Sequence, residues 1–304
     1  MRSFKDVLKH TDCKYAILDN YGVLTFDGEF EPLAVEECKR LREETGLKII
    51  LISNATYLSK DAENRFAKKG FFKNVHYDEV ITSGQYAFEE ISKGELAVSG
   101  KKFCVFGTAN FKRLEDKVPD IFKGSEYVYT DDPEDADFVY CGIPQIINSN
   151  SEAEDRVTVD DFIPQLEVLV RRRLPMVIAN PDELASEGGR FVVRQGTINK
   201  VYQSMGGETI VFGKPDVKIY RKVHEMIGLD VPKSQILMVG DTPWTDIKGA
   251  NEYGIKSCLT FYGGVAEEMM RRETRRLSFS DKDIAMWLLE QNRGIPDYIV
   301  PRIF

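Results

Sequence analysis

The sequence predicts an α/β protein built on parallel strands, and two patterns carry this prediction. Short apolar runs of four to six residues recur along the chain, each bounded by turn or capping residues. Runs that are apolar at every position are typical of parallel strands buried on both faces. Helical patterns alternate with these runs, as expected for right-handed β–α–β connections. The chain has 304 residues, which is the length of about two domains.

The strands and helices follow in order from these two patterns. Strands are expected at 15–18, 49–52, 103–106, 138–141, 176–179 and 236–239. Helices are expected at 32–44, 59–69, 159–173, 216–227, 244–253 and 282–291. Pro32 lies in the first turn of its helix and Ser59 is suited to capping the next one. The polar, turn-rich stretch 131–161 interrupts this rhythm and is interpreted as an exposed loop, and 143–158 as a loop of an inserted module.

Composition excludes several classes of function. The 41 Lys and Arg against 49 Asp and Glu give a net charge of −8, which repels polyanions, so a nucleic-acid partner is not expected. The longest apolar run is six residues, 284–289, against the about 20 that a membrane span needs. With no apolar stretch of signal-peptide length at its start, the protein is expected in the cytoplasm. The five cysteines are interpreted as buried thiols, and the three histidines have no zinc-ligand spacing.

Polar residues follow two of the first predicted strands directly. Asp19 closes the run 15–18 and precedes Gly22, so a carboxylate and a turn stand together at a strand end. A carboxylate placed there is a candidate oxygen nucleophile, while a nearby main-chain carbonyl faces a cation. Ser53 and Asn54 follow the run 49–52 and are suited to binding phosphate oxygens. In an open parallel sheet such strand ends form the ligand crevice.

Two later segments supply a cation and further carboxylates. Lys214 precedes a predicted helix and is suited to neutralising a dianion and holding a nucleophile ionised. Asp241 and Asp246 follow the run 236–239 and stand five positions apart. Hard oxygen ligands of this kind suit Mg²⁺, which takes one or two carboxylates and fills its remaining positions with water and phosphate. The cofactor expected is therefore Mg²⁺.

In this order the four segments resemble the haloacid dehalogenase (HAD) superfamily of aspartate-nucleophile phosphohydrolases. Asp19 and Ser53 are only 34 positions apart, too few for a cap domain, whereas Ser53 and Lys214 are 161 apart. The position of the cap resembles subclass IIA, the NagD-like and 4-nitrophenylphosphatase branch, and the segments 81–84, 179–182 and 206–207 agree with it. The resemblance implies a Rossmann-like parallel-sheet core, residues 1–98 and 206–304, with a smaller α/β cap inserted at 99–205.

The resemblance also implies a role for each matching position. Asp19 would form an aspartyl-phosphate, and Ser53 and Lys214 would bind the phosphoryl group. The Mg²⁺ ligands would be Asp19, the carbonyl of Tyr21 and Asp241, with Asp246 as a ligand or as a residue behind them. Substrate contacts would come from Asn54 and from Asn180 and Asp182 on a cap loop. The partner implied is a small phosphorylated metabolite, a sugar phosphate by analogy, and a homodimer is left open.

Tyr21 is the departure from the family pattern. Phosphatases of this superfamily usually have an aspartate two residues after the nucleophile, where it protonates the leaving oxygen and then activates water. A phenol with a pKa near 10 is a poor replacement at neutral pH. The sequence therefore leaves two alternatives to a phosphatase weakened in acid/base catalysis. One is an impaired descendant that binds a phosphorylated metabolite, and the less favoured one is a dehalogenase, against which Asp241 and Asp246 argue. Asp27, in an Asp-Gly hairpin turn, is considered and disfavoured as the missing acid.

Overall fold

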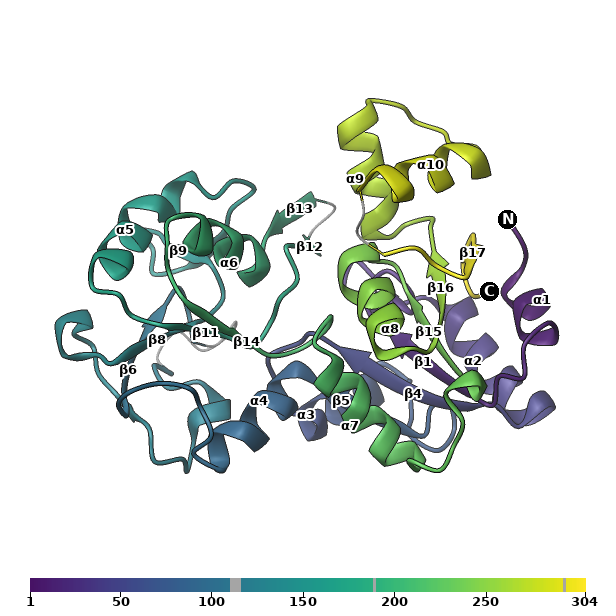
Figure 1. Ribbon diagram of the computed structural model, residues 1–304, viewed down its shortest axis with the longest axis horizontal. Helices are drawn as coiled ribbons and strands as arrows, with labels where there is room; N and C mark the ends of the chain where they lie inside the picture. The colour runs from purple at the N-terminus through teal and green to yellow at the C-terminus, as the bar shows by residue number, and fades with distance from the viewer. Residues whose placement is uncertain (110–115, 188–189, 292–293) are drawn as a thin grey trace. The chain divides into compact units, whose positions relative to one another are not determined.

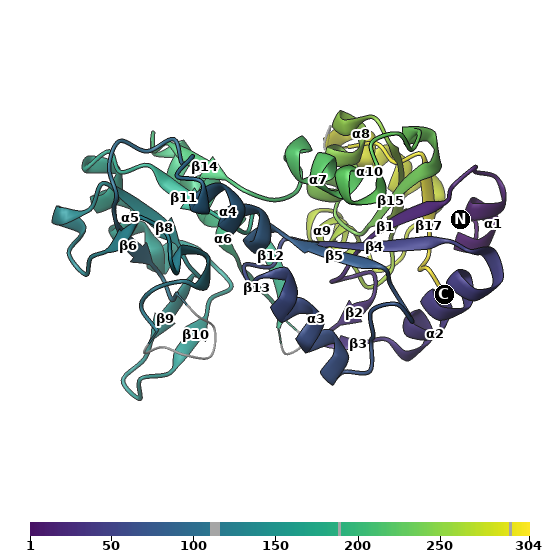
Figure 2. The same cartoon turned by 90° about the horizontal axis from the view of Figure 1, so that it is seen from below.

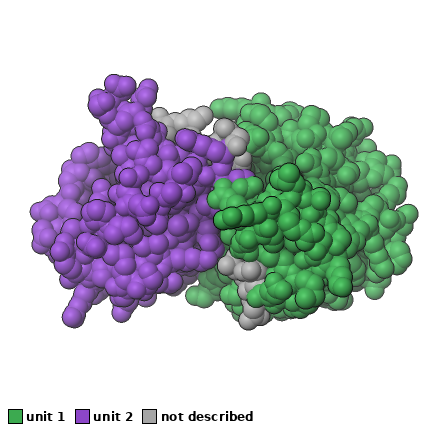
Figure 3. Space-filling model, turned by 90° about the horizontal axis from the view of Figure 1, so that it is seen from above, with its two compact units in different colours: residues 1–53, 59–81, 214–304 green, residues 54–58, 82–213 purple. Residues whose placement is uncertain are grey.

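The computed structural model describes residues 1–109, 116–187, 190–291 and 294–304. The chain divides into two compact units, shown in different colours in Figure 3. Unit 1 comprises residues 1–53, 59–81 and 214–304, and unit 2 comprises residues 54–58 and 82–213. The expected boundaries at 98 and 206 both fall inside unit 2, because a helix before the first boundary and a strand after the second pack within that unit.

Unit 1 is built on a six-stranded sheet. Its order is β17-β16-β15-β1-β4-β5, and its pairings from β17 through β4 are parallel (Figure 1). The strands are β1 (Tyr15–Asp19), β4 (Lys48–Ser53), β5 (Glu79–Thr82), β15 (Ile236–Gly240), β16 (Lys256–Thr260) and β17 (Tyr298–Val300). The central strands are buried at nearly every position, as their apolar sequences predict.

Helices cover both faces of this sheet, with α2 and α3 on one face and α7 and α8 on the other (Figure 2). The helices are α1 (Phe4–Lys9), α2 (Pro32–Thr45), α3 (Ser59–Lys68), α7 (Val217–Ile227), α8 (Lys248–Tyr253), α9 (Val265–Thr274) and α10 (Asp281–Gln291). Short helical turns are η4 (Lys233–Gln235) and the π-helical η5 (Pro243–Ile247). Local sequence sets the ends: α2 begins at Pro32 and is closed by Gly46 at φ 69°, where glycine is favoured.

A small hairpin follows β1. Its strands β2 (Thr25–Phe26) and β3 (Glu29–Phe30) pair antiparallel around Asp27 and Gly28, which have φ values of 49° and 82°. Two positive φ values at the turn are typical of a type I′ hairpin, for which Asp-Gly is a preferred sequence. The hairpin turn expected at Asp27 and Gly28 is confirmed.

Unit 2 has its own parallel sheet, with the order β14-β11-β8-β6-β7. Its strands are β6 (Lys102–Phe106), β7 (Val128–Tyr129), β8 (Phe138–Cys141), β11 (Met176–Ile178) and β14 (Thr209–Val211). The helical segments are α4 (Ser83–Ser92), η1 (Asp120–Phe122), η2 (Pro133–Asp135), η3 (Asp160–Phe162), α5 (Ile163–Arg171) and α6 (Gln195–Ser204). Buried side chains of α5, α6 and the central strands form one core. The fold class is therefore α/β, as predicted.

The stretch 131–161 is not the single exposed loop that its composition suggests. It contains the fully buried strand β8 and a hairpin of β9 (Gln145–Ile147) and β10 (Ala153–Asp155). The turn-forming residues 148–152 are the exposed tip of that hairpin, so polar composition marked the turn and concealed its strands. A second hairpin, β12 (Leu184–Glu187) with β13 (Arg190–Val193), follows β11.

Two expectations from composition can be compared with the structure. All five cysteines are free thiols, four buried and Cys13 half-buried, and burial raises the pKa of the Cys13 and Cys38 thiols to about 12. The expectation of buried thiols is therefore confirmed for four of the five and holds in part for Cys13. In the described part of the chain, no helix combines the length and the apolar character that crossing a membrane requires.

Candidate active site

The carboxyl edge of the unit 1 sheet brings the predicted charged residues together. Strands β1 and β15 are neighbours at the centre, with β4 and β5 on one side and β16 and β17 on the other. The connections leave β1 and β15 in opposite directions, and such a switch point opens a crevice at the carboxyl ends of the strands. Asp19 is the last residue of β1, and Asp241 follows the last residue of β15.

Lys214 joins two of the carboxylates. Its Nζ lies 2.6 Å from Asp19 Oδ1 and 2.6 Å from Asp246 Oδ1. The lysine side chain is 2% exposed and the Asp246 side chain is fully buried. Charge-assisted hydrogen bonds of this length are the strong kind, and in a buried site they fix the three side chains relative to one another. The lysine thus holds the Asp19 carboxylate in a defined orientation.

The position of Asp246 depends on the π-helical turn η5. Asp246 Oδ2 accepts a hydrogen bond from the backbone N–H of Thr242 at 3.0 Å, which ties the turn back to the end of β15. Residue 240 must be glycine, because a Cβ on it would lie 2.2 Å from Cγ of Asp246. The Tyr220 hydroxyl, from α7, donates to the carbonyl oxygens of Thr245 and Asp246.

Asp241 is enclosed by two glycine-containing loops. Its Oδ2 accepts from the backbone N–H of Val265 at 2.6 Å, and its Oδ1 accepts from the Thr242 hydroxyl at 2.9 Å. A Cβ on Gly22 would lie 2.1 Å from Asp241 Oδ2, and one on Gly264 would lie 2.6 Å from Asp241 Cβ. Both positions therefore exclude any larger residue. Sequence reasoning did not identify Thr242, Val265 or Gly264, and the Gly-Gly pair at 263–264 was the available signal.

The charge of this cluster is unbalanced. One carboxylate oxygen each from Asp19, Asp241 and Asp246 can be chosen so that all three lie within 4.8 Å of one another. Lys214 forms ion pairs with two of them, Asp19 and Asp246. Burial, and after it the negative charge of Asp246, raises the pKa of the Asp241 carboxyl to about 7. Three hard oxygen donors with excess negative charge are the donor set that Mg²⁺ prefers, so the residues present fit a divalent cation.

The other predicted core residues lie at the same edge. Ser53 is the last residue of β4, is 3% exposed, and follows Ile52, which pairs with Asp19 in the sheet. Tyr21 is 46% exposed and lies in the turn between Asp19 and β2. The backbone turn there is closed by the Gly22 N–H donating to the Thr25 carbonyl at 2.9 Å. The Tyr21 side chain is therefore accessible to solvent.

The predicted substrate-contacting residues Asn54, Asn180 and Asp182 belong to unit 2 and contact one another. Asn54 Nδ2 donates to Asp182 Oδ1 at 2.8 Å, and the Asp182 N–H donates to Asn180 Oδ1 at 2.9 Å. The Ser83 hydroxyl contacts the carbonyl oxygens of Ala55 and Ala179, which links the same two segments. These bonds make the loop after β11 a defined structure within unit 2.

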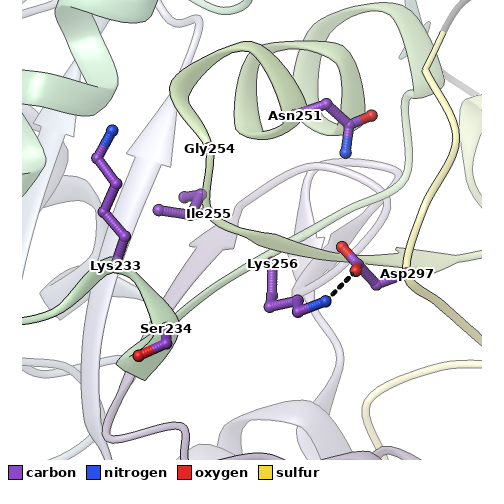
Figure 4. Close-up of a pocket in the computed structure, with 7 residues that line it drawn as sticks. All are labelled: Lys233, Ser234, Asn251, Gly254, Ile255, Lys256 and Asp297. Carbon is purple, nitrogen blue, oxygen red and sulfur yellow. Dashed lines mark hydrogen bonds and ion pairs between the residues drawn. The ribbon is translucent and has the colours of Figure 1, made fainter.

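A pocket of about 390 Å³ lies at the opposite edge of the unit 1 sheet (Figure 4). Its walls are the turn η4, the end of α8 and the start of β16, where Lys256 pairs with Asp297 at 2.5 Å. Because these are the amino ends of β15 and β16, the pocket contains none of the predicted site residues. It lies at the edge where parallel sheets do not usually bind their ligands.

Two sequence families match this chain. A model of haloacid dehalogenase-like hydrolases matches residues 16–118, and a HAD-hydrolase-like model matches residues 211–285. Together these segments contain Asp19, Ser53, Lys214, Asp241 and Asp246. The chain therefore resembles haloacid dehalogenase-like hydrolases in sequence over both parts of unit 1 that carry the cluster.

Solved structures share the fold over the whole length. A haloacid dehalogenase-like hydrolase of Brucella suis 1330 is 23% identical, with a TM-score of 0.74 and both chains covered fully. A possible sugar phosphatase of the HAD superfamily from Cytophaga hutchinsonii is 20% identical, with a TM-score of 0.73, covering 100% of this chain and 98% of that one. The fold is thus that of the HAD superfamily.

Two further likenesses are more limited. Glycerol phosphate phosphatase from Mycobacterium tuberculosis, in complex with magnesium, is 19% identical with a TM-score of 0.61, covering 100% of this chain and 78% of that one. A cardiolipin synthase (CMP-forming)/mitochondrial hydrolase fusion protein of Schizosaccharomyces pombe is 41% identical over 59 residues. That match spans 17% of this chain and 10% of the fusion protein.

Proposed function

We propose that this protein is a Mg²⁺-dependent phosphohydrolase that cleaves small phosphate monoesters through an aspartyl-phosphate on Asp19. The observation that carries the proposal is the buried cluster in which Lys214 holds Asp19 and Asp246 at 2.6 Å each, beside Asp241. Phosphatases among the structures of the same fold support it, including a possible sugar phosphatase. A sugar phosphate is accordingly the substrate class favoured.

The proposed reaction has two steps at Asp19. In the first, the Asp19 oxygen not bonded to Lys214 attacks phosphorus, and the bond between phosphorus and the leaving oxygen breaks. In the second, water cleaves the aspartyl-phosphate and restores the carboxylate. Lys214 and the Ser53 hydroxyl would bind phosphoryl oxygens, because charge grows there as the reaction proceeds.

Asp19, Asp241, Asp246 and the Tyr21 carbonyl would hold Mg²⁺. When bound, the cation supplies charge neutralisation to the phosphoryl oxygens and to the carboxylates. Asn54 would contact the substrate together with Asn180 and Asp182, which belong to the predicted cap, residues 99–205, within unit 2. Because Asn54 and Asp182 already bond to each other, we propose that they position the loop after β11 as well as contact the substrate.

The alternative function is binding of a phosphorylated metabolite with negligible turnover. The exposed Tyr21, in the position where an acid is expected, is the observation that favours it. Dehalogenation is the less favoured alternative, because it has no use for the buried carboxylates Asp241 and Asp246.

A panel of phosphate monoesters, assayed with Mg²⁺ and with EDTA, tests the proposal. We expect hydrolysis by the wild type with Mg²⁺ and none by Asp19→Asn, which preserves the shape of the side chain but removes its charge. Asp12→Asn is the matched control, because Asp12 is exposed on the loop before β1, at the opposite edge of the sheet. Full activity in EDTA, or in Asp19→Asn, would overturn the mechanism. Binding of phosphate esters without turnover would select the alternative.

A further inference from the structure

Arg302 is held at the carboxyl edge of the unit 1 sheet by stacking instead of by charge. It follows β17, which pairs with β16 at one end of the sheet (Figure 1). Its Nε donates to the Tyr262 carbonyl at 3.2 Å, and its guanidinium lies over the rings of Phe26, at 4.8 Å, and Phe304, at 5.5 Å. Such contacts fix the stem and plane of an arginine while leaving its terminal nitrogens as donors.

The charge of Arg302 has no carboxylate partner in the described part of the chain. Across residues 1–109, 116–187, 190–291 and 294–304, no aspartate or glutamate forms an ion pair with its guanidinium. Other arginines of unit 1 do form ion pairs, for example Arg221 with Glu225 and Arg276 with Asp283. A preorganised guanidinium without a carboxylate partner is suited to binding a phosphate or carboxylate from a ligand.

Arg302 lies close to the catalytic cluster. A Cβ on Gly263 would lie 3.0 Å from Arg302 Nη2, and a Cβ on the next residue, Gly264, would lie 2.6 Å from Asp241 Cβ. Because consecutive Cα atoms are 3.8 Å apart, Arg302 Nη2 and Asp241 Cβ are separated by no more than about 13 Å. That limit is the length of a small sugar carrying groups at both ends.

Two exposed aromatic side chains come from loops at the same edge. Tyr21 follows β1 and is 46% exposed, and Tyr262 follows β16 and is 37% exposed. The Tyr262 carbonyl is the group that accepts from Arg302 Nε, so this tyrosine and the arginine are neighbours. Phenol rings offer apolar faces and a hydroxyl, which suits contact with a sugar or an aromatic leaving group.

We propose that Arg302 recognises a second phosphate on the substrate, so that the favoured substrate is a bisphosphate of a small sugar. This inference rests on the proposed phosphohydrolase function. It adds that the leaving group carries a second phosphate, at its end farthest from Asp19, and that Arg302 binds this phosphate. The planar guanidinium can donate two hydrogen bonds to two oxygens of one phosphate. The rings of Phe26 and Phe304, over which it lies, keep its plane in one orientation. Arg302 would act in binding and not in the transfer of the phosphoryl group.

The competing explanation is a purely structural clamp. Phe26 belongs to the β2–β3 hairpin that follows the nucleophile, so Arg302 could act only by holding this hairpin. A clamp would affect every substrate alike, because the hairpin is linked to Asp19 and not to the leaving group. A binding residue would affect only those substrates that carry the second phosphate. The two explanations therefore differ in a ratio of rates.

The test compares fructose 1,6-bisphosphate with fructose 1-phosphate, fructose 6-phosphate and 4-nitrophenyl phosphate, all with Mg²⁺. We expect kcat/KM of the wild type to favour the bisphosphate over either monophosphate by about 10-fold or more. Arg302→Met should lower this ratio by about 10-fold, and Arg302→Lys should retain part of it. Arg221→Met, in an exposed pair on α7, is the matched control and should leave the ratio unchanged. An unchanged ratio in Arg302→Met, or an equal loss on all four substrates, would overturn the inference.

A binding measurement separates this inference from the proposed function. Calorimetric titration of Asp19→Asn with fructose 1,6-bisphosphate and fructose 6-phosphate needs no turnover. Tighter binding of the bisphosphate, lost when Arg302→Met is added, supports the inference even if the wild type hydrolyses nothing. Equal binding of the two sugars overturns it.

If Arg302→Met fails to fold, the salt dependence of wild-type KM decides, because it should be steeper for the bisphosphate than for the monophosphate. Equal salt dependence would then overturn the inference.

Discussion

The carboxyl edges of the two parallel sheets use polar residues in opposite ways. In unit 1, the carboxylates of Asp19, Asp241 and Asp246 lie close together, and the ammonium of Lys214 pairs with those of Asp19 and Asp246. In unit 2, the buried Arg194 pairs with the carboxylate of Asp155 at 2.7 Å. The edges share strand direction and loop placement, so architecture alone does not make a site. The two edges differ in charge. Arg194 in unit 2 is paired with a carboxylate of its own unit, whereas the cluster in unit 1 gathers three carboxylates, which suits the proposed cation.

The first prediction has the largest expected effect and removes the proposed nucleophile, Asp19, from the carboxyl edge of the unit 1 sheet. Asp19→Asn should lower turnover of any phosphate monoester by at least about 10⁴-fold, because an amide cannot form the covalent intermediate. Phosphate release by wild type and variant at equal concentration is the measurement. Far-ultraviolet circular dichroism establishes that the variant is folded. Residual turnover within tenfold of the wild type would contradict a covalent role for Asp19.

The second prediction compares the two buried cations directly. Lys214→Met and Arg194→Met should each lower the free energy of unfolding by about 3 to 5 kcal/mol, because each leaves buried carboxylates without a partner. Added Mg²⁺ should restore part of the loss in Lys214→Met, by binding the three carboxylates, and none in Arg194→Met. Urea unfolding with Mg²⁺ and with EDTA measures both. Equal rescue of the two variants would show that the edges do not differ in charge balance.

The third prediction uses the pH dependence of the unbalanced edge. The pKa of the Asp241 carboxyl is raised to about 7 in the fold, against about 3.9 in an unfolded chain. Between these values the folded protein holds a proton that the unfolded chain has released, so this carboxyl costs stability as pH rises from about 4 to about 7. The wild type in EDTA should therefore lose at most about 3 kcal/mol of unfolding free energy between pH 5 and pH 8, and Asp241→Asn should abolish this loss.

Urea unfolding at the two pH values in EDTA measures this effect, and Asp12→Asn is the control. Mg²⁺ should flatten the wild-type dependence, because the cation favours the ionised carboxylate. If the free energy of unfolding of Asp241→Asn depends on pH as that of the wild type does, a group other than Asp241 causes the dependence.

Much of the fold could be predicted from the sequence because burial on both faces leaves a direct signal. Runs such as 236–239 and 49–52 became β15 and β4 within one residue at each end. Strands β14, β16 and β17 were not predicted, since they are short or carry polar residues such as Ser257. The order of Asp19, Ser53, Lys214 and Asp241 indicated the cluster, because parallel strands end at one edge. The roles assigned to these residues stay predictions.

What the sequence could not indicate is the close packing that shapes the cluster. The contact of Gly22 with Asp241 joins segments more than 200 positions apart, and that of Gly264 with Asp241 joins two separate loops, so no local pattern specifies either. The amide of Val265 is likewise a backbone donor that any residue type would supply. Such features depend on the tertiary approach of loops and become visible only with coordinates.

The smallest expected effect concerns Tyr21, which stands two residues after Asp19, where the resemblance leads us to expect an aspartate as the acid. Without one, the leaving group must depart with little protonation, so 4-nitrophenyl phosphate should be hydrolysed faster than an alkyl phosphate such as glycerol 3-phosphate. Tyr21→Asp should raise alkyl turnover by about 10- to 10³-fold, less than the full effect of a general acid because a side chain 46% exposed at this position is not fixed by burial. Tyr21→Asn is the matched control, since it removes the ring without supplying a proton. The measurement is kcat/KM on both substrates between pH 6 and pH 8. If Tyr21→Asp folds, binds Mg²⁺ and is slower than the wild type on the alkyl ester, the phenol itself takes part in the reaction.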